Sequence, residues 1–264
     1  MRTIKLILAL PVVALLYIGC SKDHNYDNYD APNSGISGKL IDAETGDSLE
    51  LRLNAGTVRY RQIDARYPAP VDYDIPLRSN GSFSATNMFA GTYTFVPRDG
   101  AFKYPDVNPV NVELRPNEIA SVNFKVIPYY RISASINSNA SAAANNVTFT
   151  YTINKSAANT TDILQEVIFM VGKYARLDET VSGERSQAGL INNWIVTPRA
   201  TATTTPPILP ADPVAGFTGV QRTFTIPLWA DTGLPPGTYY FRVGVRTVAV
   251  GRYNYSKVIK ATIN

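Results

Sequence analysis

Short runs of alternating apolar and polar residues begin near Gly35 and continue to the end of the chain, interrupted by Gly, Pro, Asn and Asp. Alternation with a period of two is typical of β-strands, and no stretch of ten residues has the 3.6-residue period that predicts a helix. In the first half of the chain, the alternation predicts seven strands, at residues 36–41, 57–63, 73–77, 81–85, 92–97, 110–114 and 120–126. Seven short strands in one unit predict a β-sandwich.

Two local motifs support a sandwich over residues 35–127. Asn80-Gly81 predicts a hairpin, because this dipeptide adopts the positive φ angles of a two-residue turn. In AGTYTF, Tyr93 and Phe95 alternate with threonines, which places both rings on the buried face. The segments ISGKLIDAETGDSL and SNGSFSATNMFAGTYTFVP resemble the carboxypeptidase-regulatory, or transthyretin-like, sandwich.

A second domain is expected at residues 128–264, because Pro128 closes the last of these strands and a new alternation follows. That alternation predicts strands at residues 130–136, 146–154, 166–174, 222–227, 238–245 and 257–263. The segment LPPGTYYFRVGV resembles the corner and penultimate strand of fibronectin type III or immunoglobulin-like sandwiches, with Tyr239 as the corner tyrosine whose hydroxyl bonds back to the chain. The expected fold class is therefore all-β, with two tandem β-sandwich domains.

A long stretch near residues 182–221 is expected to form a loop of the second domain, since it has four prolines between positions 206 and 213. Insertions of this length are usually functional loops or disorder. Trp194 lies beside the prolines, and two hypotheses are open for it: a Trp buried on a strand, which is favoured, or an exposed ring that stacks on sugar. Trp194, Tyr129 and Tyr130 are the candidate ligand-binding residues.

The N-terminus has the pattern of a secretory signal over residues 1–19. Two cations precede a 13-residue apolar run at residues 6–18, which is shorter than the about 20 residues of a spanning helix. The run ends at Gly19-Cys20, which resembles the bacterial lipobox, although Tyr17 stands where leucine is usual. Cys20 is then the lipidated first residue of the mature chain; the alternative is a free thiol after ordinary cleavage.

The residues after Cys20 indicate where the anchored chain is displayed. Ser21-Lys22-Asp23 resembles the signal that sends Bacteroidota lipoproteins to the outer face of the outer membrane. The rest of residues 20–34 is polar and rich in Asn and Asp, which is typical of a flexible tether. The expected localisation is therefore the outer membrane, by a lipid anchor, facing the cell exterior.

Composition excludes several functional classes. The chain has one His and one Cys, so a zinc site or a catalytic triad is not expected. Removal of Arg2 and Lys5 with the signal leaves 23 basic against 21 acidic side chains, a net charge of +2 without a dense basic run, which argues against nucleic acid as a partner. Asp42, Glu44 and Asp47 fail the EF-hand pattern and predict a turn rather than a calcium loop, so no metal and no cofactor are expected.

The lipoprotein signal, the NYDAPN tether, the GISGKLIDAETGDSL opening and the immunoglobulin-like end together resemble a Bacteroidota lipoprotein family with a domain of unknown function, DUF3823. Members are typically encoded beside SusC/SusD-like glycan-uptake pairs. The resemblance implies a non-catalytic accessory protein that binds glycan or supports a SusC/SusD-like complex. The sixteen tyrosines favour sugar binding only slightly, because tyrosine is also common in strands.

Two alternative functions remain open from the sequence. An adhesin or scaffold that contacts protein would have the same anchor and the same two sandwiches. A glycoside hydrolase needs only two carboxylates about 5 to 10 Å apart. No paired carboxylates lie on one predicted strand face, and small sandwiches rarely form a deep cleft, so we expect that the protein is not an enzyme.

Overall fold

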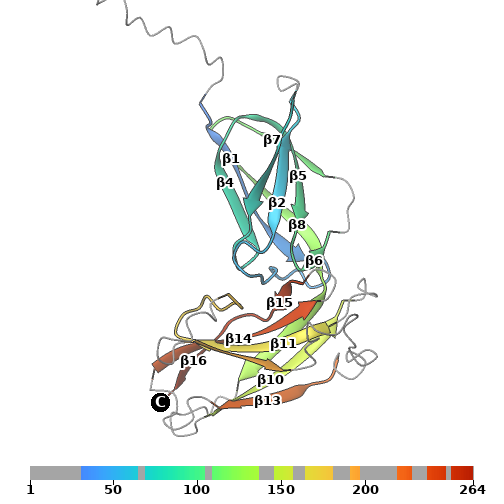
Figure 1. The fold of residues 1–264 in the computed structure, drawn as a ribbon. Helices are drawn as coiled ribbons and strands as arrows, with labels where there is room; N and C mark the ends of the chain where they lie inside the picture. The colour runs from blue at the N-terminus through green and yellow to red at the C-terminus, as the bar shows by residue number, and fades with distance from the viewer. Residues whose placement is uncertain are drawn as a thin grey trace, which may run out of the picture.

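The computed structural model describes residues 31–64, 69–104, 109–136, 146–156, 164–180, 191–196, 219–227, 237–247 and 251–263. Within these ranges the chain forms strands and no helix, and the strands build two β-sandwiches that follow one another along the chain (Figure 1). No helix of the described part is long and apolar enough to cross a membrane. Cys20 and the rest of residues 1–30 lie outside the described ranges.

The first sandwich pairs two four-stranded sheets. One sheet has the order β4 (Ser82–Met88), β1 (Ser34–Asp42), β8 (Ile119–Pro128) and β6 (Phe102–Lys103). The other has the order β3 (Asp72–Pro76), β2 (Thr57–Gln62), β5 (Gly91–Arg98) and β7 (Val110–Leu114). Alternate residues of each strand point into the core between the sheets, where Tyr93 and Phe95 are buried as predicted.

Strands β1 and β8 run parallel and hold the first domain together from end to end. Their register pairs Gly35 with Ile119 at one end and Asp42 with Val126 at the other. Gly38 lies at the middle of this ladder, where an added Cβ would be 1.7 Å from the carbonyl oxygen of Val122. The backbones therefore approach closely enough that only glycine fits there.

The second sandwich packs a three-stranded sheet on a larger one. The first has the order β13 (Arg222–Pro227), β10 (Asn146–Lys155) and β9 (Tyr130–Ile136). The second has the order β12 (Ile191–Val196), β11 (Leu164–Gly172), β14 (Gly237–Thr247) and β15 (Tyr253–Tyr255), with β16 (Ile259–Ile263) also paired to β14. Phe149, Phe169 and Phe241 meet at the centre of its core.

Three strands and one connection differ from the sequence prediction. β6 and β15 have two and three residues, too few to show a period, and they form because a partner strand lies beside them. β12 lies inside the stretch expected to be a loop, residues 182–221, and pairs with β11. Asn80-Gly81 makes a tight turn with Gly81 at φ 71°, but β3 and β4 enter different sheets, so the hairpin prediction is wrong. The turn residues determine the local bend but not the partner of the next strand.

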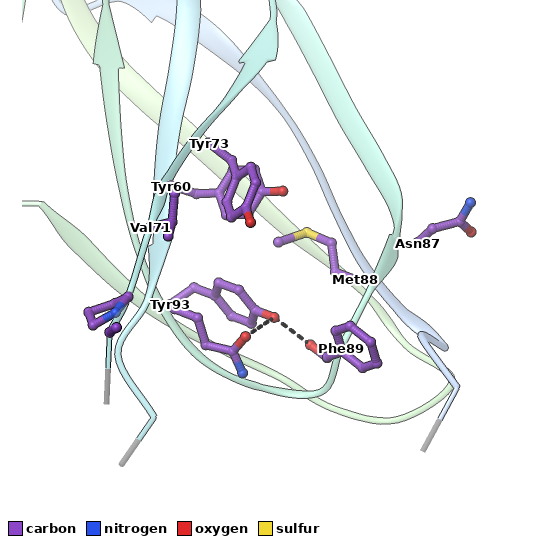
Figure 2. A pocket seen from close by; sticks show the side chains of 10 residues that line it. Tyr60, Val71, Tyr73, Asn87, Met88, Phe89 and Tyr93 are labelled. Atoms are coloured by element: carbon purple, nitrogen blue, oxygen red, sulfur yellow. Dashed lines mark hydrogen bonds between the residues drawn. The ribbon is translucent and has the colours of Figure 1, made fainter. Parts of the chain in front are cut away.

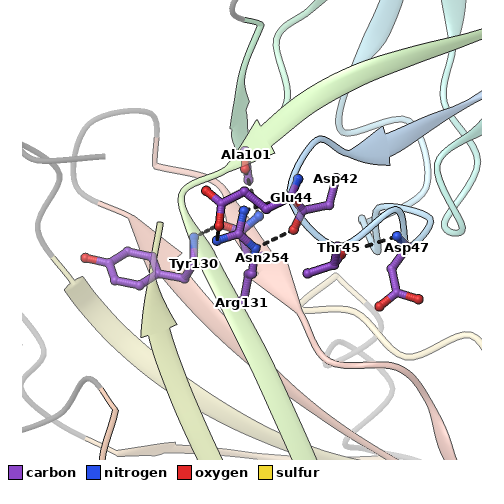
Figure 3. A network of polar contacts seen from close by, with 8 residues as sticks. All are labelled: Asp42, Glu44, Thr45, Asp47, Ala101, Tyr130, Arg131 and Asn254. Atoms are coloured by element: carbon purple, nitrogen blue, oxygen red, sulfur yellow. Dashed lines mark hydrogen bonds and ion pairs between the residues drawn. The ribbon is translucent and has the colours of Figure 1, made fainter. Parts of the chain in front are cut away.

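The two sandwiches meet with almost no linker, since β8 ends at Pro128 and β9 begins at Tyr130. Asn254 joins both sides: its Oδ1 accepts a hydrogen bond from the Tyr130 backbone N–H (3.0 Å), and its Nδ2 donates to the Ala101 carbonyl (2.7 Å). Figure 3 shows this bridge beside the ion pairs of Arg131, which extend from β9 toward the first domain.

Arg242 on β14 is the most deeply buried cation of the junction, with 2% of its side chain exposed. Its guanidinium donates a 2.8 Å hydrogen bond to the Glu50 carboxylate of the first domain. It also donates to three backbone carbonyls, those of Leu51, Leu177 and Ser256. Burial lowers the pKa of Arg242, and the nearby Glu50 charge offsets part of that effect. The two domains are thus joined by a hydrogen-bonded ion pair between a buried guanidinium and a carboxylate that is 21% exposed.

Candidate functional site

A hollow of about 260 Å³ opens at one end of the first sandwich, between the two sheets (Figure 2). One side comes from β2 and β3, and the other comes from the end of β4 and the start of β5; the residues that define it are Tyr60, Gln62, Tyr73, Met88, Phe89 and Tyr93. Met88 pairs with Ser34, the first residue of β1. The hollow therefore lies at the end of the domain where the chain enters from the N-terminal segment.

An aromatic wall lines the hollow on the β2–β3 side. Tyr60 and Tyr73 are direct partners in the β2–β3 ladder, and their rings stack with centroids 5.4 Å apart and planes 25° from parallel. Tyr60 also stacks on Phe95 at 5.9 Å, which fixes the wall to the core. Tyr73 is 55% exposed although it stands on the inner face of its strand, since Ile75 two residues later is buried. The wall thus presents an aromatic face to solvent that is held in place from behind.

A polar network closes the end of the hollow opposite this wall. The Tyr93 hydroxyl lies 3.0 Å from Gln62 Oε1 and 3.0 Å from the Phe89 carbonyl oxygen (Figure 2). The Tyr93 hydroxyl has one proton, so it can donate to only one of these two oxygens at a time. If the Gln62 amide is turned so that its NH₂ faces the phenol, Gln62 donates to the Tyr93 oxygen and Tyr93 donates to the Phe89 carbonyl. In the structure, Nε2 of the half-buried Gln62 side chain is a buried atom without a hydrogen-bond partner among the described residues. A buried polar atom without a partner is a natural contact for a ligand.

The contact from Tyr93 to Phe89 also has the geometry expected of a corner tyrosine, because the hydroxyl reaches back four residues along the chain. The sequence prediction gave this role to Tyr239, which follows a glycine in the same GTY pattern. Gly91 and Gly237 adopt matching φ values of 151° and 149°. Tyr239 is buried, but the residues just before Gly237 lie outside the described ranges. The hydrogen bond from the Tyr239 hydroxyl back to the chain therefore stays a prediction.

The described lining of the hollow has no charged side chain, and the charged residues of β2 and β3 lie on the outer face of these strands. Arg59 binds Asp74 through two hydrogen bonds of 2.9 and 3.1 Å, and Arg61 binds Asp72 at 2.6 Å, all on the outer face of β2 and β3. The Arg61 hydrogen bond holds the pKa of Asp72 below its usual value. Burial, aided by Tyr73, raises the pKa of Tyr60, so its phenol stays neutral. The site therefore offers aromatic faces and uncharged polar groups.

A second hollow, of about 300 Å³, lies at the junction of the domains, but its charged groups are already engaged. Arg131 pairs with Asp42 and, at 2.8 Å, with Glu44 (Figure 3). Lys257 pairs with Asp47 at 2.9 Å. Burial would raise the pKa of Asp42, yet hydrogen bonds from Arg131 and the Glu44 backbone N–H hold it below its usual value. The acidic groups of this hollow are structural.

The turn predicted around these acids is confirmed. Asp42 Oδ1 accepts a hydrogen bond from the Glu44 backbone N–H (2.9 Å), and Thr45 Oγ1 accepts one from that of Asp47 (3.3 Å). In the described part of the chain, no group of three or more His, Cys, Asp or Glu side chains is arranged to hold a metal ion.

The residues proposed from sequence as ligand contacts do not come together. Tyr129 and Tyr130 are buried at the junction and in the second core, so neither ring has a face for sugar. The prediction is wrong because Tyr129 and Tyr130 lie where the chain passes from one sandwich to the next. Residues of the two sandwiches cover the rings there. Trp194 lies on β12 opposite Phe169, as the strand hypothesis requires; its side chain is outside the described part.

The sequence contained a partial signal for the site that was missed. Alternation in TVRYRQ and DYDIP puts Tyr60, Gln62 and Tyr73 on inner faces. Only the pairing of these strands, and the return of β4 and β5 to the same end, bring them to Met88 and Tyr93.

Neither a family model nor a curated protein matches the sequence. Solved structures do match. A DUF3823 family protein from Bacteroides uniformis superposes with a TM-score of 0.63 at 15% sequence identity, and another from Bacteroides ovatus with a TM-score of 0.62 at 19% identity. Each alignment covers 88% of this chain and 100% of the other chain. The chain shares the fold of the DUF3823 proteins.

The DUF3823 fold also occurs in a further structure from Bacteroides uniformis, whose name proposes carbohydrate binding. It superposes with a TM-score of 0.61 at 20% identity, again over 88% of this chain and 100% of the other. The predicted all-β class, with β-sandwich domains, is thereby confirmed, and so is the resemblance to DUF3823 proteins at the level of fold. The names of these three structures state no catalytic activity.

Proposed function

We propose that the chain is a non-catalytic outer-membrane lipoprotein that binds glycan in the tyrosine hollow of its first domain and assists polysaccharide uptake. One observation carries the proposal: the half-exposed Tyr73 ring, stacked on Tyr60, lines the same hollow as Gln62, whose side chain has an unpartnered polar atom. Sugar rings have apolar faces that stack on aromatic side chains and hydroxyls that need uncharged partners. The carbohydrate-binding name of one structure with the same fold supports the same ligand class.

The absence of catalysis is supported by the lining of the hollow. Glycoside hydrolysis uses two carboxylates on either side of the bond that is cleaved. No Asp or Glu is among the described residues that line the tyrosine hollow. Its phenols and amides can bind and orient a sugar, but they have no acid and base pair for hydrolysis.

The role in uptake is supported by the position of the hollow relative to the expected anchor. Residues 20–33 can span at most about 50 Å when fully extended, and they lead into the end of the domain that contains the hollow. With Cys20 held in the outer membrane, a bound glycan would stay within that reach of the membrane surface. A SusC/SusD-like importer in the same membrane is the partner that this arrangement fits.

A polysaccharide array and titration calorimetry with residues 21–264 test glycan binding. We expect Tyr73→Ala to weaken binding by about tenfold or more, because the solvent-facing ring of the wall is lost. Tyr174→Ala is the matched control, since Tyr174 is 63% exposed and lies on the second domain. Equal behaviour of the two variants would contradict a site in the hollow. Copurification with the neighbouring SusD-like protein without binding of any glycan would favour the scaffold function instead.

Fractionation of cells that express the full chain tests the anchor. Cys20→Ser should move the protein from the membrane fraction to the soluble fraction and abolish labelling by fatty acid. Protease added to intact cells should degrade the wild-type protein if it faces outward. Membrane association that survives Cys20→Ser would contradict lipidation at this residue.

A further inference from the structure

We propose that the tyrosine hollow takes the terminal ring of an uncharged glycan, not a stretch from the middle of a chain. This inference rests on the proposed function and adds to it the part of the glycan that is recognised and the charge that is excluded. Three features of the hollow carry it: its size, its closed end and its electrostatic balance.

The volume fits one sugar ring. At about 260 Å³ the hollow is smaller than the about 300 to 1,000 Å³ typical of pockets that enclose a drug-sized ligand. A site that reads several consecutive units would need a longer groove that is open at both ends. The stacked pair of Tyr60 and Tyr73 offers one aromatic wall, which is enough for one ring.

The end of the hollow is closed by the hydrogen bonds of Tyr93. They link β2, β5 and the turn between β4 and β5 across the bottom, through Gln62 and the Phe89 carbonyl (Figure 2). A polymer therefore has no exit on that side, and a chain must enter with its end first. The terminal ring then meets the unpartnered atom of Gln62 at the bottom while its face lies on the aromatic wall.

The described lining of the hollow favours uncharged sugars over acidic ones. A carboxylate or sulfate placed next to Met88 and Val71 would lose its hydration, and no described lining residue is a cation that could replace it. Arg59 and Arg61 on the outer face of β2 are already neutralised by Asp74 and Asp72. Uncharged sugar hydroxyls lose less hydration free energy on entering the hollow, and they can form hydrogen bonds with its amide and phenol groups.

Titration calorimetry with defined oligosaccharides tests both parts of the inference. The probes are neutral xylo-, malto-, cello- and manno-oligosaccharides from two units upward with their polymers, and, as acidic probes, oligogalacturonate, oligoalginate and dextran sulfate. For the neutral series that binds, we expect one protein per chain at every length and an affinity that changes less than twofold beyond three units. We expect acidic probes to bind at least tenfold more weakly.

Variants of two amides on the same sheet, one in the hollow and one away from it, connect the result to the hollow. Gln62→Leu should weaken binding of the neutral probe by about tenfold, because the terminal ring loses its polar contact at the bottom. Asn111→Leu is the matched control, since Asn111 is an exposed amide on β7 of the same sheet and does not line the hollow. Circular dichroism verifies folding, and Gln62→Asn, which shortens the amide, provides a second measurement if Gln62→Leu does not fold.

Each outcome separates this inference from the function on which it rests. If several proteins bind one chain as its length grows, or if acidic probes bind as well as neutral ones, the inference is overturned. In that case a loss of binding in Tyr73→Ala still supports a glycan site in the hollow. If no probe binds, both fail.

Discussion

Replacement of Arg242 tests whether a buried ion pair joins the two domains. Arg242→Ala leaves the Glu50 carboxylate at the junction without its cation and leaves the Leu177 and Ser256 carbonyls without their donor. Removal of one partner of a buried ion pair typically destabilises a protein by about 3 to 5 kcal/mol. The variant also loses the contact of the guanidinium with the Tyr255 ring, 4.3 Å away.

A second ion pair at the same junction provides the control. Lys257 and Asp47 also join the two domains at 2.9 Å, but their side chains are 70% and 58% exposed. Exposed pairs contribute about 0 to 1 kcal/mol. Lys257→Ala should therefore have a small effect, although the two pairs have nearly the same length.

Differential scanning calorimetry of residues 21–264 compares the two variants. For a chain of this size each kcal/mol shifts the melting temperature by about 2 to 4 °C. We expect a decrease of about 6 to 20 °C for Arg242→Ala and less than about 4 °C for Lys257→Ala. Arg242→Ala should also split one transition into two, because the domains lose one of the ion pairs that connect them. Equal shifts for the two variants would refute the reasoning.

The pH dependence of stability gives an independent check on the Glu50 charge that Arg242→Ala leaves without its cation. Burial raises the pKa of Glu50, and the attraction of Arg242 offsets part of that rise. Without Arg242 the pKa rises further, so the folded state binds more protons than the unfolded state and stability falls as the pH rises above about 4.5. The difference in stability between wild type and Arg242→Ala should therefore be smaller at pH 4 than at pH 7. Adding Glu50→Gln to the Arg242→Ala variant should recover part of the lost stability.

Three further substitutions test other parts of the structure. Tyr93→Phe removes the hydroxyl that closes the hollow and should lower the free energy of unfolding by about 1 to 2 kcal/mol in urea titrations, with weaker glycan binding. Asp42→Asn weakens the bond to Arg131 and should cost about 1 to 3 kcal/mol at pH 7. Since the pKa of Asp42 is lowered in the fold from its usual 3.8, its contribution is lost as the pH falls below 3.8, and the difference between the two proteins should shrink in that range in the same titrations. Gly38→Ala places a Cβ against the Val122 carbonyl and should destabilise the first domain by at least about 3 kcal/mol, seen as early loss of its amide protection in hydrogen exchange.

Most strands could be predicted because alternation is a local property. The predicted ranges 110–114, 130–136 and 222–227 coincide with β7, β9 and β13. The short strands β6 and β15 could not be predicted, because their hydrogen bonds depend on a partner that is distant in sequence.

The candidate site was less predictable, because it depends on which strands become neighbours. The inward position of Tyr60 follows from its strand pattern, but its stacking on Tyr73 follows from register, and its distance from Tyr93 follows from the sheet order. Likewise, alternation places Arg242 on the strand face opposite to that of Phe241 and Val243, but it does not show what covers that face. Leu51 of the first domain and Leu177 of the second accept hydrogen bonds from Arg242 there, and the side chain is buried.

The parallel pairing of β1 and β8 has a mechanical consequence. The chain enters β1 at the end of the domain that contains the hollow, and it leaves β8 at the opposite end toward the second domain. A pull on the N-terminal segment against the second domain therefore loads β1 and β8 in opposite directions along their length. All eight residue pairs of the ladder share that load in shear, whereas a hairpin pulled from its open end would unzip one pair at a time. A force between the N-terminal segment and the second domain would therefore be carried by the β1–β8 ladder, the part of the first domain that resists shear.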